Sequence, residues 1–239
     1  MKYIDLTLPT PQENLACDEA LLDWCEAGHA PEMLRFWEPP EPFVVVGYAN
    51  KIATEVNLTA CRAHNVPVLR RCSGGGTVLQ GPGCLNYTLI LNIRESGPLH
   101  SVTETNHFIL QRHRDALAAL TGEAIEIRGA TDLAIGQSKF SGNAQRRKRR
   151  CLLFHGTFLL QFNISLVEQF LSMPSKQPAY RQNRSHADFL MNLNATPDLV
   201  KSALQEAWNA NEPLKIVPFG QIETLAQNKY SMKEWNHKF

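Results

Sequence analysis

The most unusual chemistry of this sequence is concentrated between residues 70 and 83. Two arginines, Arg70 and Arg71, are followed by three consecutive glycines and a Gly-Pro-Gly turn, and apolar segments flank the stretch. Because glycine loses more backbone entropy on folding than any other residue, it is expected where φ is positive or where a ligand comes close. Exposed amides beside two guanidinium groups suit a phosphate or a carboxylate. We therefore predict a small-anion site here, with a ligand-free glycine-rich hairpin as the alternative.

A second group of chemically capable side chains occurs between residues 139 and 162. Lys139 precedes Phe-Ser-Gly, and His155 interrupts an otherwise apolar run. Neither is diagnostic alone, because most lysines are solvated and a lone strand histidine is more often structural than catalytic. The basic run 146–150 separates two β-prone arms. This pattern predicts a long hairpin whose tip is either simply solvated or a docking patch for an acidic partner.

Composition excludes several classes of function. The formal net charge of +1 provides no overall field to attract nucleic acid. No apolar run approaches the ~18 residues that suggest a membrane span, and the N-terminus does not resemble a signal peptide, so we expect a cytoplasmic protein. The six cysteines include no CxxC pair, which favours reduced thiols over disulfides or a metal site. Neither a Walker A loop nor a Rossmann GxGxxG motif is present.

The elements that must position these residues are short and mixed. Capping patterns and apolar periodicity predict helices at 14–27, 57–64, 101–122, 165–171 and 222–229, with another starting at Thr196. Strands are predicted at 3–8, 33–37, 43–47, 124–127 and 132–135, in addition to those flanking the glycines and the basic run. Because no regular βαβ rhythm connects them, we predict an α+β fold in a single domain, residues 1–239.

Both stretches resemble signatures of the lipoate-protein ligase family. RRCSGGGTVLQGPG is similar to the family pattern RRxSGGGxVxH, and KFSGNA followed by HGTFLL is similar to its second signature. NLACDEALL, Trp37 before FVVVGYAN, Thr131-Asp132-Leu133 and a late Lys-Glu-Trp-Asn extend the resemblance over nearly the whole chain. It implies the biotin/lipoate protein ligase catalytic-domain fold, a mixed β-sheet flanked by helices. The accessory domain of two-domain ligases would then be absent or a separate subunit.

The resemblance also implies an activity and a set of site residues. Such enzymes use ATP, with Mg²⁺, to convert lipoate or octanoate into acyl-AMP. They then acylate a lysine of an acidic lipoyl carrier domain, of the 2-oxoacid dehydrogenase E2 or glycine cleavage H protein type. Lys139 matches the catalytic lysine, and Trp37 and Glu19 match the acyl pocket. The other positions matched to substrate or adenylate binding are Arg71, Ser73, Gly74, Gly75, Gly76, Thr77, Val78, Gln80, Asp132, Ser141, Gly142, Arg146, His155, Gly156 and Thr157.

Two departures concern the choice between ligase and transferase. Gln80 stands where the family has histidine, and Cys84 where it usually has asparagine. The Gly-Pro-Gly turn is similar to that of octanoyltransferases, which need no ATP and use an acyl-thioester cysteine. However, Pro174-Ser175 stands where one transferase type has Pro-Cys, and no cysteine lies between Cys84 and Lys139. We therefore predict an ATP-dependent ligase. An ATP-independent octanoyl or lipoyl transferase and a non-catalytic acyl-adenylate-binding relative that needs a partner subunit are the alternatives.

Overall fold

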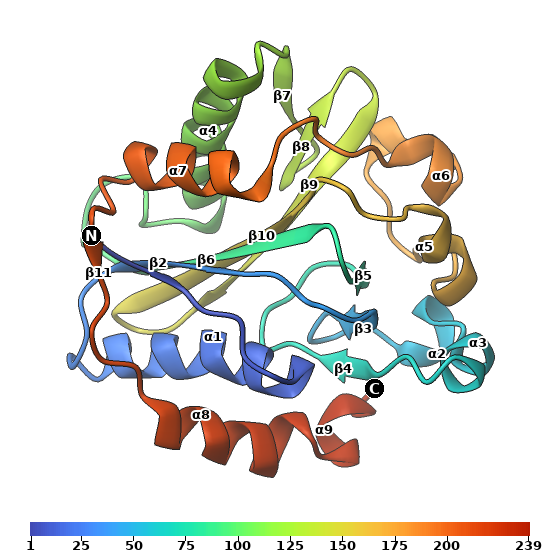
Figure 1. Ribbon diagram of the computed structural model, residues 1–239, viewed down its shortest axis with the longest axis horizontal. Helices are drawn as coiled ribbons and strands as arrows, with labels where there is room; N and C mark the ends of the chain where they lie inside the picture. The colour runs from blue at the N-terminus through green and yellow to red at the C-terminus, as the bar shows by residue number, and fades with distance from the viewer.

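The centre of the fold is an eight-stranded mixed sheet, seen edge-on in Figure 1 in a computed structural model that describes residues 1–239. Its strands follow the order β11-β1-β2-β6-β10-β9-β8-β7. β1 runs parallel to both of its neighbours, and the remaining pairs are antiparallel. The strands are β1 (Lys2–Asp5), β2 (Met33–Trp37), β6 (Cys84–Asn92), β7 (Ile125–Arg128), β8 (Asp132–Ile135), β9 (Ser138–Arg147), β10 (Cys151–Leu159) and β11 (Glu212–Pro213). The prediction of an α+β fold with a mixed sheet is confirmed.

The long hairpin predicted around the basic run is formed by β9 and β10, which pair from Leu152 with Arg147 to Phe158 with Ser141. Its tip is anchored to the first helix rather than projecting freely. Lys148 forms an ion pair with Asp23, and the carboxylate of Glu26 accepts hydrogen bonds from the backbone amides of residues 150 and 151. Part of the positive charge of the run is therefore balanced within the chain.

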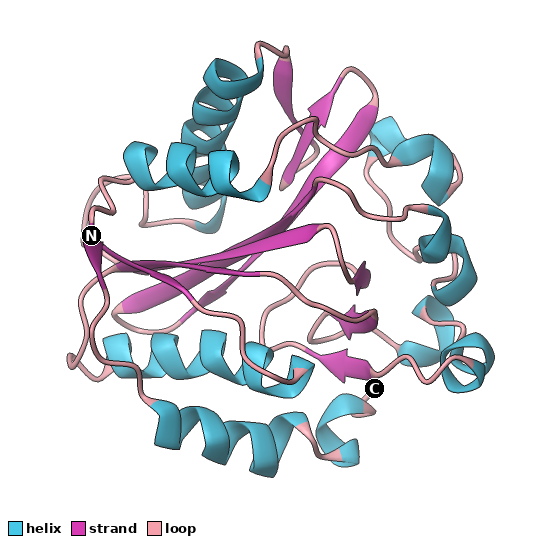
Figure 2. Cartoon of the chain, viewed as in Figure 1, coloured by secondary structure: helices cyan, strands magenta, loops and turns pink.

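Helices cover both faces of the large sheet (Figure 2). α1 (Pro11–Glu26) and α8 (Phe219–Leu225) lie on one side, and α4 (Val102–Thr121) and α7 (Pro197–Ala207) lie on the other. α1 begins with a complete capping box between Thr10 and Glu13. The Ser101 side chain caps α4, which ends at Gly122 with φ +73°. The cap signals of α4 lie within a few residues of its ends, which is why the sequence predicts its bounds well. α1 begins at Pro11, before the predicted start at residue 14.

A second sheet of three strands lies beside the first, and its order is β4-β3-β5. Here β3 (Phe43–Val46) pairs in parallel with β4 (Val68–Arg70) and antiparallel with β5 (Val78–Gln80). The alternative of a glycine-rich hairpin is therefore wrong, because β3 inserts between the two arms and the segment beyond the Gly-Pro-Gly turn, β6, joins the large sheet. A buried cluster joins this sheet to α5 (Ser165–Phe170) and to the short helices α2 (Ile52–Glu55) and α3 (Leu58–Ala63).

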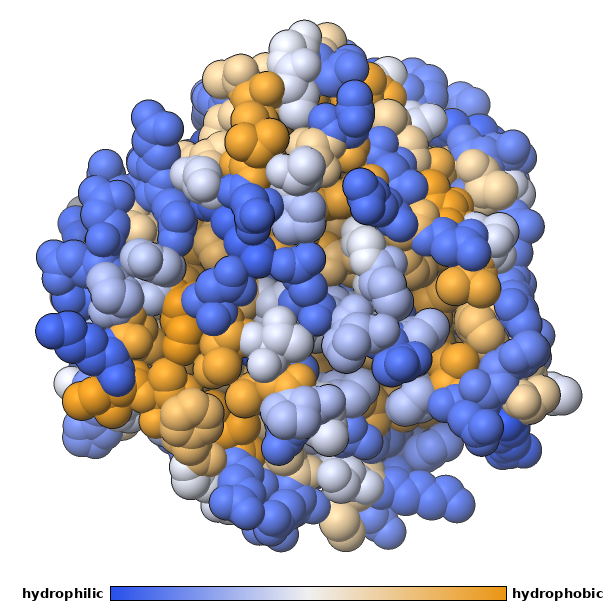
Figure 3. Space-filling view, in the orientation of Figure 1, coloured by the Kyte–Doolittle hydropathy of each residue, from blue (hydrophilic) through white to orange (hydrophobic).

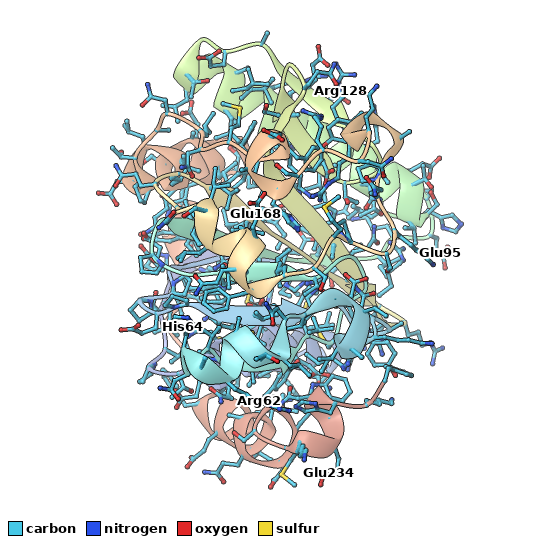
Figure 4. All side chains as sticks on the ribbon, turned by 90° about the vertical axis from the view of Figure 1, so that its right-hand side faces the viewer. Arg62, His64, Glu95, Arg128, Glu168 and Glu234 are labelled. Carbon is cyan, nitrogen blue, oxygen red and sulfur yellow. The ribbon has the colours of Figure 1, made fainter.

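The remaining elements are short and lie near the surface. They are a 3₁₀ turn (Ala179–Arg181), α6 (His186–Phe189), a π-helical turn (Ala226–Tyr230) and α9 (Lys233–Asn236). From the side of the second sheet, α5 with Glu168 lies above α3 with Arg62 and His64 (Figure 4). Figure 3 shows hydrophilic residues along most of the margin of one face, with apolar patches between them. None of the helices combines the length and the hydropathy needed to span a bilayer.

Candidate active site

A cavity of about 530 Å³ lies where the glycine stretch, the β9–β10 hairpin and the segment after α5 meet. Its volume is typical of sites for small ligands. Apolar side chains form much of the wall: Leu15, Trp37, Val45, Val78, Leu79, Phe140, Leu159, Phe162, Val167, Leu171 and Leu190. A few polar groups face the same space. A cavity of this kind can hold an apolar chain that carries one polar, reactive end.

The ammonium of Lys139 is one of these polar groups, and a carboxylate fixes its position. Its Nζ lies 2.7 Å from Oδ1 of Asp132, and the hydroxyl of Tyr180 donates to Oδ2 of Asp132 at 2.9 Å. Gly142 leaves the room this requires, because a Cβ there would lie 2.7 Å from Nζ. Burial and the neighbouring Asp132 raise the pKa of Tyr180, which keeps it a neutral donor. Lys139 is thus a positioned cation at the cavity wall.

Arg71 shapes the glycine loop from inside. Its Nη2 donates to the carbonyl oxygens of Gly74 at 2.6 Å and Gly76 at 2.8 Å. Gly75 has φ +90°, and its carbonyl lies so close to Gly47 that a Cβ at position 47 would be 2.1 Å from it. Desolvation lowers the pKa of the buried Arg71 to about 10, so it remains charged at neutral pH. The triple glycine was expected to allow a close approach to the backbone. The group that comes close is another part of the same chain, the backbone of Gly47.

Arg70 does not take part in the cavity. Its Nη1 donates to the carbonyl oxygens of Gly47, Tyr48 and Asn50, each at 2.9 Å, and its Nε contacts the carbonyls of Trp235 and Asn236. The prediction that both arginines flank an anion is wrong for Arg70. The carbonyls of the loop and of the C-terminal helix accept hydrogen bonds from Nη1 and Nε of this buried guanidinium, while its Nη2 has no partner within the chain.

A chain of hydrogen bonds connects the glycine loop to β10 and α1. Oγ of Ser73 and Nε2 of His155 are 2.6 Å apart, and Nδ1 of His155 lies 3.1 Å from Oδ2 of Asp18. Oδ1 of Asp18 is held at 2.6 Å by Arg35, and both side chains are almost fully buried. Burial alone would raise the pKa of Asp18, but Arg35 and His155 hold it below its usual value. Asp18 is therefore a carboxylate at neutral pH.

Gln80 belongs to a closed ring of amide and hydroxyl groups at the cavity. Its Nε2 donates to Oγ1 of Thr157 at 2.6 Å, Thr157 donates to Oδ1 of Asn86 at 2.5 Å, and Asn86 donates back to Gln80 at 3.0 Å. The glutamine that departs from the family pattern thus has a partner within this chain at both ends of its amide, and Gln80 and Thr157 form part of the lining.

The structure brings together most of the residues predicted from the sequence. Those that line the cavity are Trp37, Arg71, Gly75, Gly76, Thr77, Val78, Gln80, Asp132, Lys139, Ser141, Gly142, His155, Gly156 and Thr157. Ser73 and Gly74 lie just behind, in the loop that Arg71 braces. Arg146 lies outside the cavity, with its guanidinium over the ring of Tyr48. The lining residues Asp18, Asn86, Asn143 and Lys176 were not predicted, and Tyr180 was missed as the partner of Asp132.

The placement of Glu19 in the acyl pocket is wrong. Its carboxylate binds Nζ of Lys229 at 2.7 Å and the hydroxyl of Tyr230 at 2.8 Å, against the C-terminal helices. Asp18 faces the cavity instead. Successive residues of an α-helix point about 100° apart, so two neighbours cannot share one face. The signal that could have identified Asp18 was the helical phase of the buried residues Leu15 and Leu22 on α1.

None of the six thiols lines the cavity, and all six cysteines are buried. Burial raises the pKa of Cys72 and of Cys84 to about 12. Both thiols, which the sequence places in the glycine stretch, are therefore neutral and packed.

The structure holds no group of three or more His, Cys, Asp or Glu side chains arranged to bind a metal ion. Mg²⁺ brought in with a nucleotide needs only one or two protein carboxylates. Asp132 is the carboxylate beside Lys139, and both of its oxygens already have partners.

The family model described as the lipoyl protein ligase A/B catalytic domain matches residues 10–208. The chain belongs to this family. It is 26% identical to octanoyltransferase LipM of Oceanobacillus iheyensis, over 95% of this chain and 92% of that one. It is 28% identical to lipoate–protein ligase 1 of Staphylococcus aureus, over 99% of this chain and 73% of that one. This chain is thus similar to relatives that are named for two different reactions.

Solved structures show that the fold is shared with lipoate-protein ligases. The bipartite lipoate protein ligase of Thermoplasma acidophilum, studied with its E2 lipoyl domain, superimposes with a TM-score of 0.83 at 21% identity. The match covers 99% of this chain and 95% of that chain. At this identity the likeness establishes the fold, and the reaction must be argued from the residues of the cavity.

Proposed function

We propose that this protein transfers an octanoyl or lipoyl group from a thioester donor to a lysine of a lipoyl carrier domain, without ATP. The observation that carries the proposal is the end-to-end similarity to proteins named octanoyltransferase, which extends over 92% of the relative from O. iheyensis and 98% of the one from Bacillus subtilis. The prediction of an ATP-dependent ligase has weaker support, since the relative with that name is matched over 73% of its length.

The cavity offers what such a transfer requires. An apolar wall can hold the acyl chain, and the Lys139 ammonium at that wall would stabilise the charge that develops on the carbonyl oxygen. The loop at Gly75 and Gly76 faces the same space with backbone groups. These features stabilise a tetrahedral oxyanion whatever group leaves, so they serve a thioester donor and an acyl-adenylate donor alike.

The buried thiols specify how a transferase of this kind would work. With Cys72 and Cys84 neutral and outside the cavity, no cysteine is placed to form an acyl-enzyme. We therefore propose that the carrier lysine attacks the donor thioester directly. The carrier would be an acidic lipoyl domain of the 2-oxoacid dehydrogenase E2 or glycine cleavage H protein type.

The same absence of a cavity thiol favours a second candidate, the ATP-dependent ligase. In that reaction ATP converts octanoate or lipoate into acyl-AMP, and no cysteine is required. The ATP would be bound as a substrate beside Lys139 and the glycine loop, together with its Mg²⁺.

The deciding experiment offers purified protein two alternative donors with the same lipoyl domain as acceptor. One reaction contains octanoyl-loaded acyl carrier protein, and the other contains free octanoate or lipoate with ATP and Mg²⁺. Mass spectrometry of the acceptor measures acylation, and pyrophosphate release measures acid activation. Acylation from the carrier thioester alone is expected. Acid-dependent pyrophosphate release, with no reaction of the thioester, would replace the transferase by the ligase.

A third result would replace both candidates. If neither donor acylates the lipoyl domain, a relative that binds acyl-adenylate and needs a partner subunit becomes the better description. Binding of a non-hydrolysable octanoyl-adenylate analogue, measured by calorimetry, would then test it.

A further inference from the structure

Lys139 reaches Asp132 because the pairing of β8 with β9 is irregular. The register changes between Leu133 and Ala134, which leaves one extra residue on β9 at this point. A bulge of this kind redirects a side chain that a regular strand would point to the opposite face. The ammonium of Lys139 therefore lies against Gly142, the residue of β9 that is paired with Asp132.

The carboxylate of Asp132 has one oxygen for Lys139 and one for Tyr180. Oδ1 forms the ion pair with the ammonium at 2.7 Å, and Oδ2 accepts from the Tyr180 hydroxyl at 2.9 Å. Because the hydroxyl occupies Oδ2, the carboxylate does not turn to bind the ammonium with both oxygens. Asp132 is the single ion-pair partner of Lys139, so most of its three N–H donors remain available to a ligand in the cavity.

The Tyr180 hydroxyl is held in this place by the backbone that carries it. Nη2 of Arg184 donates to the carbonyl oxygens of Gln137 at 2.7 Å and of Tyr180 at 3.0 Å. Gln137 directly precedes β9, so the tyrosine is tied to the strand that carries Lys139. Its ring also packs against Phe189, with the ring centroids 5.1 Å apart. The hydroxyl therefore has a fixed direction of approach.

We infer that Tyr180 is a positioning residue for acyl transfer: its hydroxyl occupies one oxygen of Asp132 and so leaves the Lys139 ammonium free to bind the oxyanion. The inference rests on the proposed function, and it holds for a thioester donor and for an acyl-adenylate donor alike. No bond to Tyr180 forms or breaks in the reaction. The hydroxyl keeps its proton throughout and acts by hydrogen bonding alone.

The alternative is that Tyr180 only fastens the segment after α5 to β8. Gln177 and Pro178 of that segment line the cavity, so a displacement of the segment would also lower activity. The two roles differ in one respect. A hydroxyl that acts through the ion pair has nothing to act on once the ammonium is gone, whereas a fastening role persists. Coupling between variants at positions 139 and 180 therefore distinguishes them.

The experiment is a double-mutant cycle. Tyr180→Phe removes the hydroxyl but keeps the ring, and it is made in the wild type and in the Lys139→Met variant. Acylation of the lipoyl domain is measured with the donor that the wild type uses. Tyr230→Phe is the matched control, because Tyr230 donates to Glu19 at 2.8 Å beside Lys229, the same three groups outside the cavity. Melting temperatures show which losses come from unfolding.

We expect Tyr180→Phe to lower kcat about tenfold, on the scale of one hydrogen bond to a charged group, with an unchanged KM for the lipoyl domain. In the Lys139→Met background the same change should alter the residual rate by less than about twofold. Tyr230→Phe should lower the melting temperature without changing kcat. An equal loss in both backgrounds, or no loss in the wild type, would overturn the inference.

A spectroscopic measurement tests the ion pair directly. The nitrogen NMR signal of the Lys139 ammonium, assigned by its absence from Lys139→Met, should shift in Tyr180→Phe and stay in place in Tyr230→Phe. An unchanged signal in Tyr180→Phe would show that the hydroxyl does not act on the ion pair. Failure of the wild type to transfer from either donor would refute the proposed function and the inference with it, whereas an active wild type without coupling would refute the inference alone.

Discussion

Lys139 is a cation held in place at the cavity wall, since Asp132 orients it and Gly142 makes room for it. Replacing Lys139 by Met keeps the apolar stem and removes the charge. We expect kcat/KM for acyl transfer to fall roughly 10²-fold or more, the scale of losing one preorganised donor. The melting temperature should change little, because the side chain is partly exposed and not part of the core.

The matched variant Lys139→Arg tests whether position or charge matters. A planar guanidinium is larger than an ammonium, and the space beside Gly142 is already closed, so the rescue should be poor. Near-normal transfer by a folded Lys139→Met protein would remove Lys139 from the mechanism.

Cys84 is the thiol to replace first, because the sequence places it in the glycine stretch where the family usually has asparagine. Its side chain packs in the core of the second sheet and its pKa is raised to about 12. We expect Cys84→Ala to retain its transfer activity, and treatment of the wild type with iodoacetamide at pH 7 to leave it active. A thiol that became acylated during turnover, detected by mass spectrometry of the enzyme, would contradict direct transfer.

At the scale of elements, the contact between α4 and α7 contains a buried titratable group. His113 on α4 accepts a hydrogen bond from Trp208 at 2.8 Å, and burial lowers its pKa to about 3. The unfolded chain binds a proton at this residue near pH 6.5 while the folded protein does not. The contribution of the neutral His113 to the free energy of unfolding is therefore present above pH 6.5 and is lost as the pH falls toward 3.

We expect the free energy of unfolding, measured by urea titration, to lose roughly 2 kcal/mol between pH 7 and pH 5 through this group. His113→Gln keeps an acceptor for Trp208 and should flatten this part of the profile. His107→Gln, an exposed change on the same helix, serves as the control and should leave the slope unaltered. The same slope in His113→Gln as in the wild type would show that His113 is protonated in the folded protein.

At the scale of the whole molecule, the basic hairpin tip lies far from Lys139. Lys139 and Arg147 are at opposite ends of β9, roughly 27 Å apart at about 3.4 Å per residue. Lys176, by contrast, is exposed and lines the cavity. The geometry therefore favours a solvated hairpin tip and a docking surface for the acidic carrier around the cavity mouth.

Two charge reversals test this arrangement. Lys176→Glu should raise the KM for the lipoyl domain several-fold and weaken its salt dependence, because a like charge opposes an acidic partner near the site. Arg149→Glu at the tip should leave acceptor kinetics unchanged. Arg62→Glu on α3 supplies a control on another part of the surface (Figure 4). A larger effect of Arg149→Glu than of Lys176→Glu would restore the tip as the docking patch.

The sequence by itself determined the features that depend on neighbours along the chain. The cap at Ser101, the glycine that ends α4 and the strand Met33–Trp37 were predicted correctly because their hydrogen bonds and periodicity involve residues a few positions apart. The α+β class and the family could also be predicted, since the two signatures are contiguous.

Only the tertiary structure decided which side chains meet. Ser73 and His155 are 82 positions apart and His155 and Asp18 are 137 apart, so no local pattern could pair them. Helical phase places Asp18 rather than Glu19 in the cavity. A hydrogen bond between distant residues forms only when the packing of the elements between them brings donor and acceptor together. Burial then excludes the water that would compete for both groups.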